Sequence, residues 1–242
     1  MNRYFYAVAM ATVMTAICFA GCSNAPVEES DTGIKSSDIE SSISAESSVT
    51  DTDASATTSE VQAEKDVLDA AKAYGMTQVG DHQEMINLWG GFDSASVYYI
   101  AKDSDEATAL YSSIFNLDGK SFPDVKANEM IMCIDKNAAE SNGRSTTSEI
   151  YEITLADNAS AQALYEAFSQ KKDSYRYSSG TANGYTYTIG YYESANGCVA
   201  VGTFIKDYVV IRMLSIGDFE AADKCISFFC GELGFESPLS LK

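Results

Sequence analysis

The single histidine, His82, is the first residue whose type could do chemistry. Within Asp81-His82-Gln83-Glu84 its imidazole could act as a general base or a metal ligand, and with nearby acids it would suit an extracellular hydrolase. No Gly-x-Ser-x-Gly motif supplies a matching nucleophile. A lone histidine beside acids in a polar loop is more often simply solvated. We therefore expect no catalytic residue and keep the hydrolase as the alternative function.

Three acidic side chains, Asp103, Asp105 and Glu106, could offer oxygen ligands to calcium. They lack the further ligands and the glycine of an EF-hand loop, and a helix N-cap with acids in its first turn explains them equally well. Phosphate-cradling motifs of the GxxxxGK[ST] and GxGxxG types are absent from the sequence. We expect no metal and no cofactor.

Tyrosine is the residue type that stands out, with 15 in the chain. Tyr185, Tyr187 and Tyr191 share parity on one predicted strand and should face the same side of a sheet. Such a row either packs against a helix, shields a sheet edge, or forms a binding surface of rigid rings with polar tips. Arg212, on a nearby predicted strand, could contact a carboxylate ligand or pair with one of the many acids. These four are our candidate binding residues.

Repeated strand–helix units should position these side chains. Residues 97–101 are rich in β-branched and aromatic types, and an acidic cap and a helical apolar stripe follow them. The same order returns at 149–155 and, more loosely, at 208–214. The first two predicted helices share the tripeptide Ala-Leu-Tyr, at 109–111 and 163–165.

The remaining elements complete an α+β domain. We predict helices over 63–74 and 83–89, a strand over 130–134, and a hairpin in which Asn196-Gly197 joins two β-rich runs. The second half then has the order β-α-β-β-β-α. We expect an antiparallel sheet whose one face is covered by helices, ferredoxin-like in character. This globular domain should span residues 63–242, with possible halves at 63–140 and 147–242.

The N-terminus has the pattern of a secretory signal peptide over residues 1–21. Arg3 precedes an apolar run that ends in small residues before Cys22. The run is shorter than the roughly 20 apolar residues of a transmembrane helix. The sequence Phe19-Ala20-Gly21-Cys22 resembles the lipobox of bacterial lipoproteins, although Phe19 stands where an aliphatic residue is usual. The resemblance implies cleavage before Cys22 and acylation of this cysteine with diacylglyceryl and palmitate.

Residues 22–62 should form a disordered tether. Between residues 23 and 62 there are nine acidic residues, one basic residue and no aromatic residue. Such a segment cannot bury enough apolar surface to fold, and its charges repel one another. Of the net charge of −19, about −12 remains on the globular domain once the signal and tether are removed. An acidic surface repels phosphate backbones, so we expect no nucleic-acid partner.

Four cysteines remain after the signal and Cys22 are set aside: Cys133, Cys198, Cys225 and Cys230. Each lies within an apolar stretch, which favours buried small hydrophobic side chains. An exported chain could also form disulfides. No CxxC pair or Cys/His set indicates zinc or redox chemistry.

The layout resembles a family of uncharacterised membrane lipoproteins of Gram-positive bacteria. The likeness rests on the lipobox, the acidic tether, the strand from Ser148 to Asp157 that leads into a helix, and the later strand Lys206-Asp207-Tyr208-Val209-Val210 before the final helix. It covers mainly residues 148–230 and implies a fold and a location at the outer face of the cell membrane. We expect a lipid-anchored binding or accessory domain whose ligand or protein partner is not specified by the sequence. We also considered the solute-binding component of a transporter. Such proteins usually have two lobes in a longer chain, so the length of this chain argues against that function.

Overall fold

The computed structural model describes residues 65–116, 122–137, 145–195 and 197–242. The predicted signal peptide (1–21), Cys22 and the predicted tether (22–62) lie outside the described residues. Within the described ranges, no helix combines the length and apolar character that a membrane span requires.

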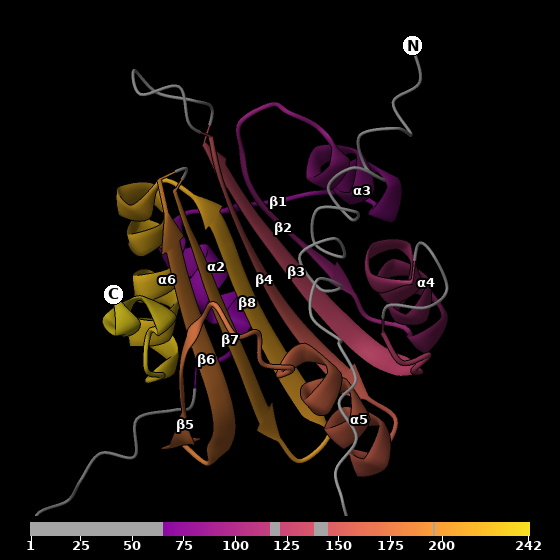
Figure 1. The fold of residues 1–242 in the computed structure, drawn as a ribbon. Helices are drawn as coiled ribbons and strands as arrows, with labels where there is room; N and C mark the ends of the chain where they lie inside the picture. Colours follow the sequence, from indigo (N-terminus) through magenta and orange to yellow (C-terminus); the bar gives the residue numbers. More distant parts are fainter. Residues whose placement is uncertain (1–64, 117–121, 138–144, 196) are drawn as a thin grey trace, which may run out of the picture.

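One eight-stranded sheet forms the centre of the domain (Figure 1). Its strands follow the order β1-β2-β3-β4-β8-β7-β6-β5, and every neighbouring pair is antiparallel except β1 and β2. The strands are β1 (Thr77–Gln78), β2 (Ala95–Ala101), β3 (Ala127–Asn137), β4 (Thr146–Leu155), β5 (Arg176–Ala182), β6 (Tyr185–Ser194), β7 (Gly197–Lys206) and β8 (Val209–Gly217).

Each helix begins at an aspartate whose side chain accepts a hydrogen bond from a first-turn backbone N–H. These side chains satisfy donors that have no partner inside the helix, as expected of an N-cap. The helices are α2 (Val67–Tyr74), α3 (His82–Gly90), α4 (Ser104–Phe115), α5 (Asn158–Phe168) and α6 (Phe219–Leu233), followed by the 3-10 helix η1 (Pro238–Leu241). Gly75 and Gly234 end α2 and α6 in the left-handed conformation that glycine adopts readily.

The α+β class is confirmed, but helices cover both faces of the sheet. Helices α2 and α6 and the η1 segment pack on one face around a core that includes Ile150, Phe204 and Phe229. Helices α3, α4 and α5 pack on the other face around a core that includes Met132 and Leu164. Our expectation of one covered face was wrong because the strands carry apolar residues at both parities. Consecutive residues of β3 from Met130 to Ile134 are all buried.

The suggested halves share this sheet. Strands β3 and β4 pair along their length, from Ala127 opposite Leu155 to Asn137 opposite Thr146. The described residues on either side of 138–144 therefore contribute to one continuous structure.

Two strands were missing from the sequence prediction. Strand β5 pairs with β6 as the edge of the sheet, so the second half has four strands between its two helices. Strand β1 has only two residues and pairs with β2 in parallel. Neither has the alternating apolar pattern on which the prediction relied.

Candidate ligand-binding pocket

The three candidate tyrosines of β6 face the same side of the sheet, as their parity predicted, but this side is covered. Tyr187 and Tyr191 are 7% and 0% exposed, and Tyr185 is half-buried. Their rings pack against Phe204, Phe219 and Phe235 beneath α6 and the C-terminal segment. The structure therefore places them in the core, and they do not form an exposed binding surface.

Arg212 lies on the opposite face of the sheet, away from those tyrosines. Its Nη1 donates to the carbonyl oxygen of Phe168, at the end of α5, at 2.6 Å and to Thr203 Oγ1 at 2.8 Å. Its guanidinium also lies 5.1 Å from the centre of the Phe168 ring. Neither of the two ion pairs among the described residues includes Arg212. Arg212 is thus a half-buried cation without a carboxylate partner in this part of the chain.

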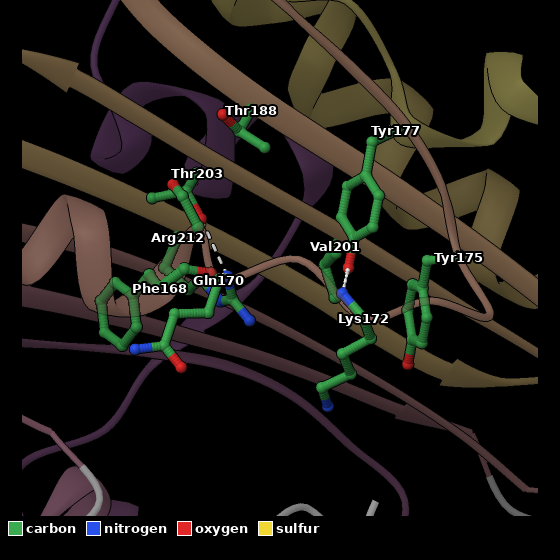
Figure 2. A pocket seen from close by; sticks show the side chains of 10 residues that line it. Phe168, Gln170, Lys172, Tyr175, Tyr177, Thr188, Val201, Thr203 and Arg212 are labelled. Atoms are coloured by element: carbon green, nitrogen blue, oxygen red, sulfur yellow. Dashed lines mark hydrogen bonds between the residues drawn. The ribbon is translucent and has the colours of Figure 1, made fainter. Parts of the chain in front are cut away.

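A small pocket lies between the end of α5 and the sheet, and Arg212 forms part of its wall (Figure 2). The pocket has a volume of about 40 Å³. Figure 2 shows Phe168, Gln170 and Thr203 around Arg212, with Tyr175 and Tyr177 on the other side of the opening. The lining comes from α5, the segment that follows it, and four strands: Phe168, Ser169, Gln170, Lys172, Tyr175, Tyr177, Thr188, Val201, Thr203 and Arg212.

A row of polar side chains crosses the sheet beneath this pocket. Arg212 on β8 pairs with Thr203 on β7, Thr203 pairs with Thr188 on β6, and Thr188 pairs with Ser179 on β5. Thr188 Oγ1 also lies 3.0 Å from the hydroxyl of Tyr165 in α5. The register therefore places hydrogen-bonding groups side by side across four neighbouring strands.

The aromatic wall of the pocket depends on a glycine. Tyr177 on β5 pairs with Gly190 on β6, and a Cβ at position 190 would lie 2.6 Å from Tyr177 Cε1. The ring can lie against β6 only because no side chain is present there. Tyr177 Oη accepts a hydrogen bond of 2.7 Å from the backbone N–H of Lys172. Tyr175 stacks between Tyr177 and Tyr192, with ring centres 5.9 and 5.3 Å apart.

Basic side chains gather at the mouth of the pocket although the domain as a whole is acidic. Lys171 Nζ lies 5.7 Å from the Tyr177 ring centre, and Lys172 Nζ lies 5.7 Å from that of Tyr175. Arg176 is not part of this group, because it lies 5.2 Å from the ring centre of Tyr191 on the opposite face of the sheet. Contacts between cations and aromatic faces are favourable, so the rings hold positive charge near the opening.

One hydroxyl in the pocket wall has no hydrogen-bond partner among the described residues. Ser169 lines the pocket immediately after α5, and its Oγ is buried without a hydrogen bond to any described residue. A buried hydroxyl without a partner costs free energy. The pocket wall therefore includes a buried hydroxyl whose hydrogen-bonding capacity the described residues do not use.

A second buried polar cluster lies further along the same face. Lys136 Nζ donates to the carbonyl oxygens of Leu88, Trp89 and Gly91 and so satisfies the end of α3. Glu149 accepts hydrogen bonds from Trp89 Nε1 at 3.0 Å and from the Tyr151 hydroxyl at 2.5 Å. Burial lowers the pKa of Lys136 and raises the pKa of Glu149, and the attraction between the two opposes both shifts.

Arg212 is electrostatically connected to this cluster. Tyr151, which donates to Glu149, pairs directly with Arg212 across β4 and β8. Burial lowers the pKa of Arg212 to about 10, and the nearby Tyr151, Tyr175, Tyr177 and Glu149 oppose that shift. The guanidinium remains charged at neutral pH.

The other candidate residues of the sequence lie outside this pocket. His82 is the half-buried first residue of α3, and no hydrogen bond joins it to a carboxylate or serine among the described residues. Asp103 caps α4 through the backbone N–H of Glu106 at 3.0 Å. In the described ranges, no group of three or more His, Cys, Asp or Glu side chains could hold a metal ion.

The four cysteines of the domain are all buried and free. Burial raises the pKa of Cys133, Cys198, Cys225 and Cys230. Raised pKa values disfavour the reactive thiolate, so these residues act as small core side chains.

Sequence reasoning identified Arg212 but missed most of its surroundings. Ser169, Gln170, Thr188 and Thr203 are small or polar residues without a motif. The sequence signal that could have indicated this segment was local positive charge, because Lys171 and Lys172 are adjacent in an acidic chain.

Comparisons with known proteins add no functional assignment. No family model matches the chain, and no curated protein matches it. Among solved structures, the extracellular domain of PknH from Mycobacterium tuberculosis aligns with 67% of this chain and 92% of that domain, at 11% sequence identity and a TM-score of 0.31. Similarity at this level carries no argument about fold or function.

Proposed function

We propose that the protein is a lipid-anchored, extracytoplasmic binding domain without catalytic activity, and that its ligand binds in the pocket beside Arg212. One observation carries the binding site: a half-buried arginine lines the pocket and has no carboxylate partner among the described residues. A buried charge is costly unless other groups compensate it. A ligand that contacts Arg212 would supply that compensation.

The location rests on the sequence alone. A lipobox-like sequence at Cys22 and a long acidic tether favour a domain held away from the outer face of a membrane. The proposed relationship to uncharacterised Gram-positive lipoproteins points the same way.

The absence of turnover is also part of the proposal. Arg212, Ser169 and the tyrosine wall can bind and orient a ligand, but no described group beside them is arranged as a nucleophile with an activating base. His82 lies on α3, which does not line the pocket. The alternative function of a hydrolase is therefore tested by asking whether the protein converts the compound that it binds.

A pocket-filling variant tests the binding site. Val201 lines the pocket, so Val201→Phe should place a ring in the space that a ligand would occupy. The matched control is Val199→Phe, because Val199 lies on the same strand with the same parity but does not line the pocket. Each protein is dialysed against the small-molecule fraction of its host's culture medium, and retained compounds are identified by mass spectrometry.

We expect the wild type and Val199→Phe to retain the same compound and Val201→Phe to lose it. The retained compound should have the same mass before and after incubation. Equal retention by Val201→Phe would place the site elsewhere. Conversion of the compound by the wild type would show an enzyme.

A further inference from the structure

The face of the sheet beneath α3 and α5 carries more buried positive than negative charge. Lys136 and Arg212 are cationic, whereas Glu149 is the carboxylate that lies between them along the polar clusters. Of these three side chains only Arg212 lines the pocket, because Lys136 and Glu149 lie outside its lining. A half-buried guanidinium in the pocket wall favours an anion over a neutral or cationic ligand.

The unused donors of Arg212 fit one type of anion well. Both of its protein hydrogen bonds come from Nη1, and no described residue accepts from Nε or Nη2. Guanidinium groups present adjacent N–H donors in a plane, and this arrangement matches the two oxygens of a carboxylate. The free Nε–Nη2 edge can therefore bind a carboxylate through two parallel hydrogen bonds.

Ser169 is a further possible donor in the wall of the same pocket. Its buried hydroxyl has no other partner among the described residues and lines the same pocket. Two independent features thus point to one occupant, an unpaired buried hydroxyl and the unused edge of a guanidinium.

The size of the pocket limits what enters it. A volume of about 40 Å³ accommodates a small group or a few waters but not a whole organic molecule. The rest of the ligand would lie at the mouth, against the rings of Tyr175 and Tyr177 (Figure 2). A flat or apolar group would be favoured there because aromatic faces bind such groups.

From these contacts we infer that the pocket binds the carboxylate of a small organic acid, with Arg212 and Ser169 as its donors and the Tyr175–Tyr177 wall against the remainder of the molecule. This inference rests on the proposed function and specifies the chemical class of its ligand. A phosphate can also accept two hydrogen bonds from a guanidinium edge, but its additional oxygens and charge require more donors than Arg212 and Ser169 supply.

Nitrogen-15 NMR of the domain tests this directly. Acetate and benzoate are titrated at constant ionic strength against sodium chloride, while the side-chain Nε–H resonance of Arg212 is followed. We expect this resonance to shift with both carboxylates and to saturate at a lower concentration of benzoate than of acetate. Inorganic phosphate is titrated in a separate experiment and should bind more weakly than benzoate.

Three variants identify the donors. Arg212→Gln should weaken carboxylate binding roughly tenfold or more, and Ser169→Ala should weaken it by a smaller factor. Arg176→Gln is the matched control because Arg176 is exposed on β5 and does not line the pocket. Its affinity for benzoate should equal that of the wild type.

The possible failures are distinguishable. If no carboxylate shifts the Arg212 resonance, Arg212 only caps α5 and this inference is overturned. The proposed function would still be supported if the wild type retained another compound that Val201→Phe lost. Tighter binding of phosphate than of benzoate would also overturn the carboxylate assignment. Equal losses of carboxylate affinity in Arg176→Gln and Arg212→Gln would show non-specific attraction to positive charge and not binding in a specific site.

Discussion

At the residue scale, the shape of the pocket depends on Gly190 because a side chain there would compete with the Tyr177 ring. A Cβ at this position would lie 2.6 Å from Tyr177 Cε1 and 3.0 Å from Val201 Cγ2. Both neighbours line the pocket. Glycine at this point of β6 is therefore required by side-chain packing between strands, since its backbone is ordinary extended strand.

We predict that Gly190→Ala destabilises the domain by about 1–3 kcal/mol, the usual effect of overpacking a filled site. The displaced Tyr177 should also lose the hydrogen bond between its hydroxyl and the Lys172 N–H. Urea unfolding measures the loss of stability. The affinity for a carboxylate measures whether displacement of Tyr177 disturbs the pocket. Gly231→Ala is the control because a Cβ added at this helical position of α6 would meet no atom within 4 Å apart from its chain neighbours and the backbone of its own helix. Alanine there should stabilise the domain by about 0.5–1 kcal/mol. Equal stability of Gly190→Ala and wild type would contradict the packing argument.

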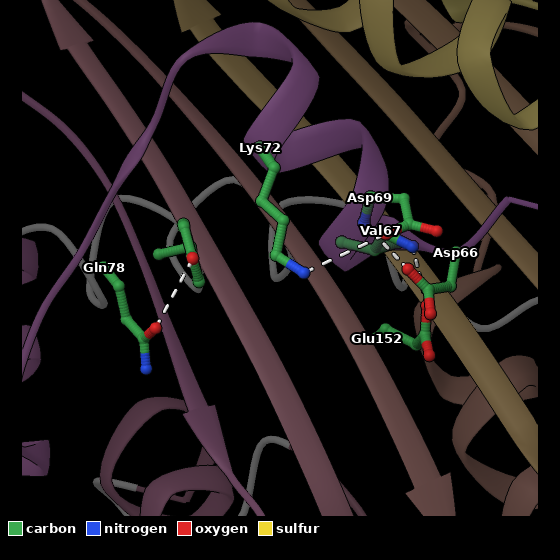
Figure 3. Close-up of polar contacts among 7 residues, drawn as sticks. Asp66, Val67, Asp69, Lys72, Gln78 and Glu152 are labelled. Atoms are coloured by element: carbon green, nitrogen blue, oxygen red, sulfur yellow. Dashed lines mark hydrogen bonds and ion pairs between the residues drawn. The ribbon is translucent and has the colours of Figure 1, made fainter.

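At the element scale, helix α2 is attached to the sheet partly through a carboxyl group of β4. Glu152 Oε2 accepts a hydrogen bond of 3.1 Å from the backbone N–H of Val67, the first residue of α2 (Figure 3). Burial raises the pKa of Glu152 to about 7, the charges of Asp66 and Glu129 add to this shift, and the hydrogen bond from Val67 opposes it. The junction where the chain enters the described domain is therefore sensitive to pH near neutrality.

The sign of this effect follows from proton binding. The folded protein holds the Glu152 proton up to about pH 7, whereas the unfolded chain releases it near the ordinary value of 4.5. The stability associated with the proton is complete below pH 4.5 and is lost as the pH rises through 7. Glu152→Gln keeps an acceptor for the Val67 N–H without the charge. The free energy of unfolding of Glu152→Gln should exceed that of the wild type by about 1–2 kcal/mol above pH 7. The two free energies should be equal below pH 4.5.

Unfolding free energies measured between pH 4 and 8 test this expectation. The exposed Glu166→Gln on α5 serves as the control and should run parallel to the wild type across the range. If Glu152→Gln also ran parallel to the wild type, the buried carboxyl would have an ordinary pKa in the folded state.

The elements differ in how well the sequence predicted them. Helices α4, α5 and α6 followed from Asp103, Asp157 and Asp218 because N-caps and apolar stripes are local signals. Gly75 likewise marked the end of α2. Strand β5 was missed because its sequence from Ser178 to Thr181 is small and polar, and an edge strand half exposed to solvent needs no apolar alternation.

The binding site was harder to predict than the fold because it depends on which face each strand presents. Parity correctly grouped Tyr185, Tyr187 and Tyr191, but it could not show that α6 and the C-terminal segment cover them. Thr188, which has the opposite parity on β6, lines the pocket on the other face of the sheet. Which face of the sheet carries the pocket depends on where the helices pack, and this long-range placement cannot be read from a local sequence pattern.

At the scale of the whole molecule, the proposed anchor and the acidic domain have opposite effects on membrane association. The domain carries most of the net charge of −19, and two ion pairs join its described residues. Such a surface is repelled by anionic lipid headgroups. In the proposed arrangement, attachment would depend on acyl chains at Cys22, because each buried methylene contributes about 0.8 kcal/mol and two or more chains are needed for lasting binding.

We predict that Cys22→Ala releases the full-length protein from the membrane fraction into the medium or periplasm of its host. The domain itself should be unaffected, because residue 22 lies outside the described fold. Membrane and soluble fractions are compared by immunoblot, and the N-terminus of the membrane-bound protein is examined by mass spectrometry. Cys133→Ala controls for the loss of a thiol, since Cys133 is buried in β3 and should leave the location unchanged. Retention of Cys22→Ala in the membrane, or an uncleaved and unmodified N-terminus in the wild type, would show that attachment occurs by another route.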